Sequence, residues 1–250
     1  MGDTYGPFRS STGYTEQVNG LGQRIGGEPI SSLPNRAAHR PVGPAPTGTG
    51  PVRTRRRRPM IVGIGGTTRT DSATHRALTA VLATMAQAGA ETVLFGSAEL
   101  DLPMYTPERP ERSAATLRLL AAVEQADAVV IATPGYHGGM SGLVGMSGLV
   151  KNALDYLEDL RGAPRPYLDG RAVGLIVCAQ GTQAAVTTLD ALRSCVHALR
   201  GWPTPLGVTL NTEEPLFDAH GRLIDPAAAA RLETLVDQIM GFTYAWSQVI

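Results

Sequence analysis

The chain has 250 residues, and its 22 Lys and Arg residues balance 22 Asp and Glu residues, so its formal net charge at pH 7 is zero. This length allows one or two domains, and the balanced charge makes nucleic acid an unexpected partner. No stretch approaches the ~20 consecutive apolar residues of a membrane span, so we expect no membrane association.

Residues 1–58 differ in composition from the rest of the chain. They are rich in Gly, Pro, Ser, Thr and Arg, with no sustained period of 2 or 3.6. Such a segment buries too little apolar surface to offset its ordering entropy, which predicts a disordered or loosely ordered tail. Nine Arg and three acidic residues give this tail a charge of +6, which leaves −6 on residues 59–250. We expect residues 59–250 to form one globular domain.

The tail ends in a basic run, Arg53–Arg58. A solvated charge cluster at the domain edge is the favoured interpretation, and contact with an anionic partner is the alternative. A twin-arginine export signal is excluded because the apolar run that follows, Met60–Gly65, is short and interrupted by glycine.

From Met60 onward, segments with strand character alternate with segments of helical period. Continuous apolar runs predict strands covered on both faces, and apolar residues at helical spacing predict amphipathic helices. Strands are expected at Met60–Gly65, Glu91–Gly96, Ala128–Thr133, Ala172–Ala179 and Pro205–Leu210. Helices are expected at Ser72–Gly89, Ser113–Ala126, Lys151–Leu160, Ala184–Leu199 and Pro226–Trp246.

End signals support several of these helices. Ser113 is a candidate N-cap, Gly89 a candidate C′ residue, and Pro226 stands near the first helical position. Five strands interleaved with helices predict an α/β fold with a doubly wound, five-stranded parallel sheet. Ligands of such sheets bind beyond the carboxyl ends of the strands, where the loops after strands one, three and four are distinctive.

The first of these loops, Gly65–Thr74, joins a strand to a helix. Its small residues allow close backbone approach, and the helix amino end offers free N–H groups to a phosphate. The hydroxyls of Thr67, Ser72 and Thr74 can donate hydrogen bonds, and Arg69 can supply a charge-assisted one. The loop has neither a Walker nor a GxGxxG pattern. An ordinary capped turn, with Ser72 as cap and Arg69 solvated, is an equal alternative.

The second loop, Thr133–Gly139, follows the third strand. Pro134 stiffens the exit, and glycines including Gly135 and Gly138 expose backbone amides. Tyr136 and His137 offer a flat face or a polar edge to a planar ring, although Tyr136 could instead pack on the next helix and His137 could be solvated. No Cys/His cluster with metal-ligand spacing exists, so no metal site is expected. The third loop, Ala179–Gln183, contributes Gly181 and neighbouring amides.

Three segments occur in the chain in this order: GGTTRTDSATHRAL, LDLPMY and, with one copy of a repeat removed, ADAVVIATPGYHGGMSGLVKNALDYL. With these segments, the chain resembles the NADPH-dependent FMN reductase family over roughly Met60 to Leu210. The resemblance implies a flavodoxin-like sheet of order 2-1-3-4-5. It implies that the FMN phosphate is bound by Thr67, Arg69, Ser72 and Thr74. It further implies that the isoalloxazine is lined by Pro134, Gly135, Tyr136, His137 and Gly138, with Gly181 at the pyrimidine edge.

The same resemblance implies a homodimer or homotetramer with flavin sites near the subunit interface.

Two residues depart from the family pattern: Gly135 stands where an acidic residue is common, and His137 where Asn is common. A larger departure is the sequence GMSGLV, which occurs at Gly139–Val144 and again at Gly145–Val150. Four glycines in this stretch disfavour helix, so we expect a longer loop with Lys151–Leu160 keeping its place. This duplicated segment is either a tolerated insertion or an active-site lid.

These features predict an FMN-dependent NAD(P)H oxidoreductase. NADPH or NADH would deliver hydride to the flavin, and electrons would pass to a second flavin, a quinone, an azo compound, oxygen or a partner monooxygenase. No side chain is assigned as a catalytic acid or base. The alternative is a non-catalytic flavin-holding interaction protein whose repeat blocks the site. Cys178 and Cys195 are expected to be buried free thiols, which fits a cytoplasmic location.

Overall fold

A six-stranded parallel sheet forms the centre of the computed structural model, which describes residues 58–69, 71–136, 146–218 and 222–246. The strands are β1 (Met60–Gly65), β2 (Glu91–Phe95), β3 (Ala128–Pro134), β4 (Ala172–Ala179), β5 (Trp202–Pro203) and β6 (Val208–Asn211). The helices are α1 (Ala73–Gln87), α2 (Ala114–Gln125), α3 (Gly148–Asp155), the 3₁₀ helix η2 (Tyr156–Leu160), α4 (Thr182–Ala198) and α5 (Pro226–Trp246). The tail predicted at residues 1–58 lies, except for Arg58, outside the described residues. The boundary between this tail and the domain at residues 59–250 therefore stays a prediction.

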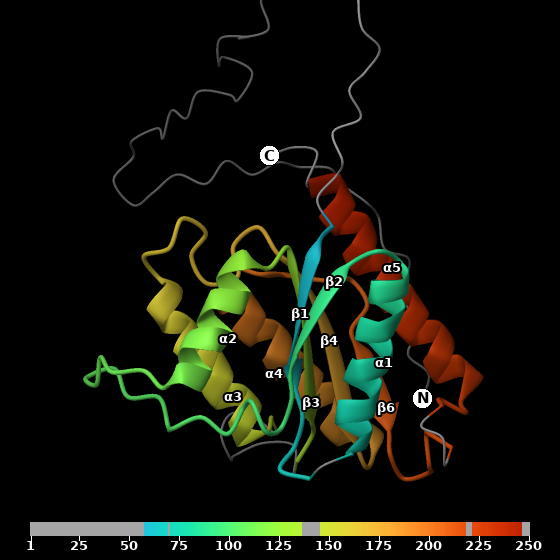
Figure 1. Cartoon of the computed structure of the whole chain (residues 1–250). Helices are drawn as coiled ribbons and strands as arrows, with labels where there is room; N and C mark the ends of the chain where they lie inside the picture. The colour runs from blue at the N-terminus through green and yellow to red at the C-terminus, as the bar shows by residue number, and fades with distance from the viewer. Residues whose placement is uncertain (1–57, 70, 137–145, 219–221, 247–250) are drawn as a thin grey trace, which may run out of the picture. The chain divides into compact units, whose positions relative to one another are not determined.

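The strands lie in the order β2-β1-β3-β4, with β5 and β6 both paired in parallel to β4. This confirms the predicted doubly wound sheet, and the order is that of flavodoxin-like folds. Helices α1 and α5 cover one face, and α2, α3 and α4 cover the other (Figure 1).

Each central strand supplies residues to two hydrophobic cores. In β1, Val62 and Ile64 belong to the core under α2, α3 and α4, while Ile61 belongs to the core under α1 and α5. In β3, Val129 belongs to the core under α2, α3 and α4, and Val130 belongs to the core under α1 and α5. Successive side chains of a strand point to opposite faces, so both faces must be apolar. This is why these strands appear in the sequence as unbroken apolar runs.

The predicted end signals of the helices are confirmed. The Ser72 hydroxyl accepts a hydrogen bond from the His75 N–H at 3.3 Å, and the Ser113 hydroxyl accepts one from the Thr116 N–H at 3.1 Å. Gly89 has φ +96°, the left-handed conformation that suits a glycine at the end of α1. Pro226 is the first residue of α5.

Two predicted helices begin earlier than expected. Helix α3 starts at Gly148 and not at Lys151, and its last residues continue as η2. It includes Val150, which is fully buried, so core packing extends the helix into the second copy of the repeat. Helix α4 starts at Thr182 because Gly181, with φ +92°, turns the chain immediately before it.

The fifth strand is divided into two short pieces, β5 and β6. The backbone between them leaves β4, and the Thr204 hydroxyl donates a hydrogen bond to the Leu206 carbonyl at 2.8 Å. Pro205 lies in this gap and has no N–H to give to the ladder. The predicted single strand at Pro205–Leu210 is therefore placed correctly at the sheet edge but is wrong in its first residues.

None of the described helices is both long enough and apolar enough to cross a membrane.

Candidate functional site

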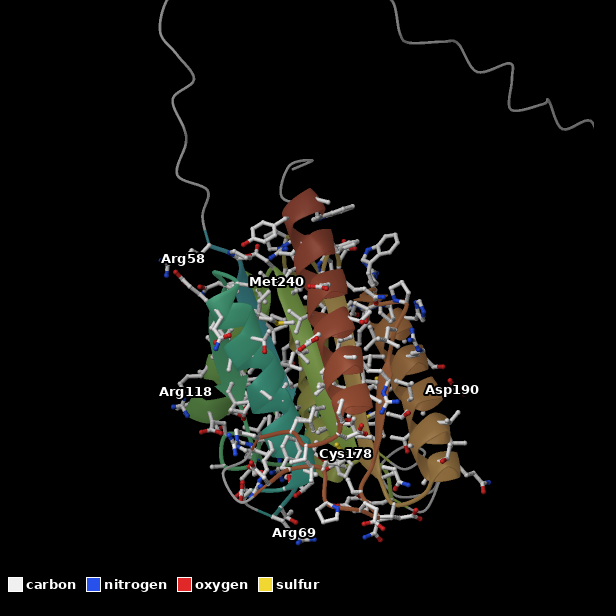
Figure 2. The ribbon with its side chains drawn as sticks, turned by 90° about the vertical axis from the view of Figure 1, so that its right-hand side faces the viewer. Arg58, Arg69, Arg118, Cys178, Asp190 and Met240 are labelled. Atoms are coloured by element: carbon white, nitrogen blue, oxygen red, sulfur yellow. The ribbon has the colours of Figure 1, made fainter. Side chains whose placement is uncertain are left out.

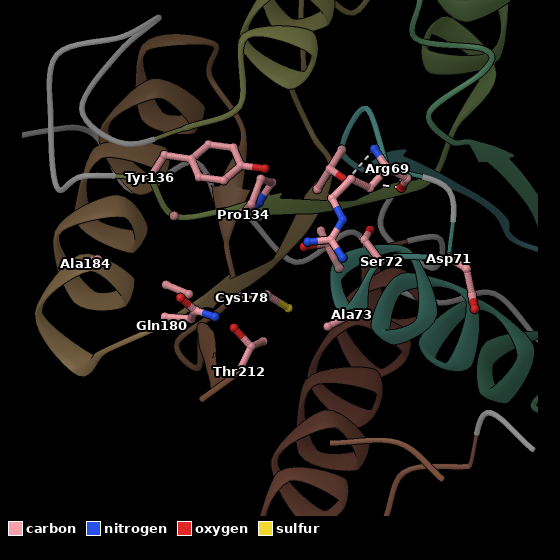
Figure 3. Close-up of a pocket in the computed structure, with 14 residues that line it drawn as sticks. Arg69, Asp71, Ser72, Ala73, Pro134, Tyr136, Cys178, Gln180, Ala184 and Thr212 are labelled. Carbon is pink, nitrogen blue, oxygen red and sulfur yellow. Dashed lines mark hydrogen bonds between the residues drawn. The ribbon is translucent and has the colours of Figure 1, made fainter. Parts of the chain in front are cut away.

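A pocket of about 660 Å³ lies at the carboxyl ends of β1, β3 and β4 (Figure 3). It is lined by Thr67, Arg69, Asp71, Ser72, Ala73, Thr74, Pro134, Gly135, Tyr136, Cys178, Ala179, Gln180, Ala184 and Thr212. Arg69 marks this end of the molecule, and Arg58, just before β1, lies at the other end (Figure 2). The volume falls within the ordinary range for a small-molecule site, about 300–1,000 Å³.

Most of the residues chosen from the sequence line this one pocket. Seven of them do so: Thr67, Arg69, Ser72, Thr74, Pro134, Gly135 and Tyr136. Gly181 is not in the lining, although its neighbour Gln180 is. His137 and Gly138 lie outside the described residues. The loops after β1, β3 and β4 therefore converge, as expected for the carboxyl edge of a doubly wound sheet.

The first loop begins with two glycines that have no room for a side chain. A Cβ on Gly65 would lie 2.3 Å from the Ala132 carbonyl oxygen. Gly66 has φ +140°, and a Cβ there would lie 2.8 Å from Ser97 Oγ. The chain can leave β1 in this direction only because both residues are glycine.

Within this loop, Thr67 closes a local turn. Its buried hydroxyl donates to the Arg69 carbonyl at 3.1 Å and accepts from the Arg69 N–H at 3.0 Å. The hydroxyl is therefore already engaged with the loop backbone, and its predicted role as a phosphate donor stays a prediction.

Ser72 caps α1 and still keeps a proton to give. Because its oxygen accepts from the His75 N–H, its own O–H is available to an anion. The exposed Arg69 side chain makes no hydrogen bond or ion pair to another described residue, and its guanidinium is directed toward Ser72 (Figure 3). A partnerless guanidinium beside free helix N–H groups is an arrangement that suits an anion.

The second loop brings Gly135 close to α4. A Cβ on Gly135 would lie 3.0 Å from Ala179 Cβ and 3.1 Å from the Ala184 carbonyl oxygen. This close packing accounts for glycine at a position where the family pattern commonly has an acidic residue. The next residue, Tyr136, is 43% exposed on the α4 side of the pocket (Figure 3), so its ring is not packed into the core.

Cys178 forms part of the pocket wall from β4. Burial raises the pKa of this thiol to about 11, although a hydrogen bond from the Thr74 side chain opposes the shift. The thiol is therefore protonated at neutral pH and is not a nucleophile. Both Cys178 and Cys195 are free, as the sequence predicts, but only Cys178 is fully buried, whereas Cys195 is partly exposed.

Sequence reasoning missed several lining residues, namely Asp71, Ala73, Cys178, Ala184 and Thr212. Asp71 and Ala73 stand inside the first loop and could have been included with it. Thr212 directly follows β6, and the carboxyl end of that strand reaches the same sheet edge as those of β3 and β4. Cys178 pairs with Pro134 in the register between β3 and β4. This register places Cys178 beside Pro134, which the sequence had already indicated, and so reveals that Cys178 reaches the pocket.

The second copy of the repeat is anchored to the core on the α3 side. Met146 and Ser147 are buried, and the Ser147 N–H donates to Thr133 Oγ1 at 3.0 Å. Residues 137–145, which contain the first copy and the start of the second, lie outside the described residues.

Deleting either copy of GMSGLV gives the same chain, in which one copy precedes Lys151. Because one copy can make the anchoring contacts of Met146, Ser147 and Val150, we expect this shorter protein to fold and to bind flavin. Loop shortening of this size changes closure entropy by less than about 1 kcal/mol. Thermal unfolding and flavin titration of the two proteins test this, and an unfolded deletion protein would contradict the loop interpretation.

Comparison with known proteins agrees with this geometry. The sequence profile of the NADPH-dependent FMN reductase family matches residues 59–214. An NADPH azoreductase from Bacillus sp. (strain OY1-2) is 30% identical over 122 residues, which are 48% of this chain and 62% of that enzyme. The FMN-dependent NADPH-azoreductase of Staphylococcus haemolyticus is 30% identical over 146 residues, 58% of this chain and 71% of that enzyme.

Solved structures share the fold at lower identity. FerB, a flavoenzyme NAD(P)H:(acceptor) oxidoreductase from Paracoccus denitrificans, superimposes with a TM-score of 0.54 at 24% identity, covering 75% of this chain and 98% of that one. RosB, solved with bound 8-demethyl-8-formylriboflavin-5'-phosphate, gives a TM-score of 0.61 at 15% identity, covering 76% and 81%.

The profile match runs from the residue before β1 to just beyond β6, so it includes the whole sheet and the three loops that form the pocket. The sheet order, the converging loops and this match agree, and the chain belongs to the NADPH-dependent FMN reductase family.

Proposed function

We propose that the protein is an FMN-dependent NAD(P)H oxidoreductase. The observation that supports this most directly is the asymmetry of the pocket. One side presents Arg69, Ser72 and the amino end of α1, which suit a phosphate, and the other presents Tyr136 and Pro134, which suit a planar ring. FMN has a phosphate at one end and a planar ring at the other.

The residues present fit this group. The Arg69 guanidinium has no partner among the described residues, and Ser72 keeps a proton to donate. Gly65 and Gly66, where no side chain has room, fix the direction in which the loop leaves β1. We propose that Thr67, Arg69, Ser72 and Thr74 hold the phosphate end, Thr67 chiefly by fixing the turn. His137, Gly138 and Gly181 remain proposed ring contacts together with Pro134, Gly135 and Tyr136.

Bound FMN would supply the hydride and electron chemistry, so the chain needs to supply binding, orientation and electrostatics. Arg69 and the α1 amino end offset the phosphate charge. Gly135 brings the β3 exit against α4, which fixes the wall beside Tyr136. The Cys178 thiol, kept protonated by its raised pKa, adds no charge to the pocket.

The electron acceptor is proposed to be a second flavin, a quinone, an azo compound or a partner monooxygenase. The names of the Bacillus and Staphylococcus relatives support an azo compound. A homodimer or homotetramer and a cytoplasmic location belong to the same proposal, the latter because both cysteines are free.

The deciding experiment is the visible spectrum of the FMN-loaded protein, recorded without oxygen before and after NADPH or NADH is added. Rapid bleaching of the flavin band is expected, and the faster donor identifies the preferred nicotinamide. Bound flavin that stays oxidised with both donors would contradict the reductase and favour the flavin-holding alternative. Failure to bind FMN would contradict both.

Arg69→Ala tests the phosphate end of the pocket. We expect FMN binding to weaken by about 1.5–3 kcal/mol, because a charge-assisted hydrogen bond is lost. Binding of riboflavin, which has no phosphate, should change little. Arg118→Ala, which removes an exposed arginine on α2, is the matched control. Unchanged FMN affinity in Arg69→Ala, measured by flavin fluorescence titration, would refute this role.

A further inference from the structure

An acidic residue stands beside the proposed phosphate site, where it is unfavourable for binding an anion. Asp71 lines the pocket directly before the Ser72 cap. Its φ of +60° is a left-handed conformation that non-glycine residues adopt uncommonly and that Asp and Asn adopt more readily than most. A carboxylate at this point lies close to the α1 amino end, where it would repel a phosphate.

The Asp71 carboxylate forms an ion pair with Arg76, which lies in the first turn of α1. Arg76 Nε donates to Asp71 Oδ1 at 2.7 Å, and Arg76 NH2 pairs with Asp71 Oδ2. Both carboxylate oxygens are therefore engaged in the two-pronged geometry that arginine favours. These hydrogen bonds lower the pKa of Asp71, so the carboxyl is charged at neutral pH. Figure 3 shows the Asp71 side chain directed away from Arg69 and Ser72.

Arg76 is itself fixed from the other side. Its guanidinium lies 5.9 Å from the centre of the Phe217 ring, and it interacts electrostatically with Asp218. Its side chain is only 29% exposed, whereas that of Asp71 is 66% exposed. The less exposed partner is thus the arginine, and it sets the position of the more exposed carboxylate.

We propose that Arg76 is a positioning residue for the phosphate end of the pocket: it holds the Asp71 carboxylate outward and offsets its charge, so that a phosphorylated flavin binds better than an unphosphorylated one. This inference rests on the proposed function, because it assumes that the phosphate lies at the α1 end. It assigns no contact between Arg76 and the ligand.

The test is a double-mutant cycle on the full-length protein freed of flavin, with FMN and riboflavin titrated separately by fluorescence. Arg76→Gln should weaken FMN binding roughly three- to ten-fold, because the released carboxylate repels the phosphate. Asp71→Asn keeps a residue that tolerates positive φ, and combined with Arg76→Gln it should restore FMN affinity to within about twofold of the wild type. Riboflavin affinity should change less than about twofold in every variant.

Arg161→Gln serves as the matched control. It removes one exposed arginine of an ion pair, with Glu158, outside the pocket, so it changes net charge equally. It should leave both affinities unchanged. Raising the salt concentration to about 1 M should shrink the effect of Arg76→Gln, since the Debye length falls to about 3 Å.

The outcomes distinguish failure of the positioning role of Arg76 from failure of the proposed function. If Arg76→Gln weakens FMN and riboflavin binding equally, Arg76 only supports the fold; if Asp71→Asn does not rescue FMN binding, Arg76 acts other than through Asp71. Either result overturns the inference. If the wild type prefers FMN and no variant changes that preference, the inference fails while the proposed function stands. If the wild type binds FMN no better than riboflavin, the proposed phosphate site fails first.

Discussion

Gly65→Ala is expected to destabilise the protein by about 3 kcal/mol. The new Cβ would lie 2.3 Å from the Ala132 carbonyl oxygen and 2.9 Å from Ala132 Cβ. Gly65 and Ala132 are register partners in the centre of the sheet. Since β3 is also bonded to β4 on its other side, Ala132 cannot move away without breaking a second ladder.

Chemical denaturation of the two proteins measures this loss. Gly241→Ala in α5 is the matched control, because no atom of the described residues, apart from its chain neighbours and the nearby backbone of its own helix, lies within 4 Å of the position of its new Cβ. Replacing a helical glycine there should stabilise the protein by up to about 1 kcal/mol. A Gly65→Ala protein as stable as the wild type would show that the exit from β1 adjusts more freely than its packing indicates.

Arg171→Ala is expected to cost about 2–4 kcal/mol of stability. The Arg171 side chain is fully buried at the amino end of β4. It donates to the carbonyls of Ala126 and Glu124 at 3.0 and 2.7 Å, and to those of Asp169 and Tyr167 at 3.1 and 3.3 Å. Burial lowers the pKa of Arg171 to about 10, so the guanidinium is still charged at neutral pH.

The effect arises because truncation removes the side-chain donor of the Asp169 and Tyr167 carbonyls, leaves Arg165 alone on those of Glu124 and Ala126, and opens a cavity that the side chain filled. Arg165→Ala is the control, since Arg165 donates to the same Glu124 and Ala126 carbonyls from a partly exposed position. Water can replace Arg165, and its loss should cost less than about 1 kcal/mol. Denaturant titration measures the loss of stability in each variant. Equal losses in Arg171→Ala and Arg165→Ala would contradict the greater importance of the buried arginine.

The order of the elements and the type of sheet could be predicted because they depend on short-range patterns. Ala128–Thr133 and Ala172–Ala179 are unbroken apolar runs, and such runs become central parallel strands whatever lies between them. Ser72, Ser113 and Gly89 satisfy helix ends through residues at most five positions away. The first and second loops were found for the same reason, since each follows a recognisable strand and precedes a recognisable helix.

The start of α3 and the course of the fifth strand could not be predicted in this way. Helix α3 begins at Gly148 because Val150 packs into the core, and two glycines per copy of the repeat gave no local sign of that helix. The fifth strand is divided after Thr204, whose N–H still donates to Val173 of β4 at 3.0 Å, and its first piece begins at Trp202. Its local apolar pattern alone could not show where pairing with β4 stops.

By itself, then, the sequence determined the alternation of strands and helices, the helix caps and the two loops that carry the predicted pocket residues. Only the tertiary structure decided that Cys178 and Thr212 reach the same pocket, that the Thr67 hydroxyl closes a turn, and that Arg76 holds Asp71 outward. The physical reason is range. Caps and periodicity act within a few residues, whereas the pocket depends on strand register and side-chain conformation, which are set by packing between distant parts of the chain.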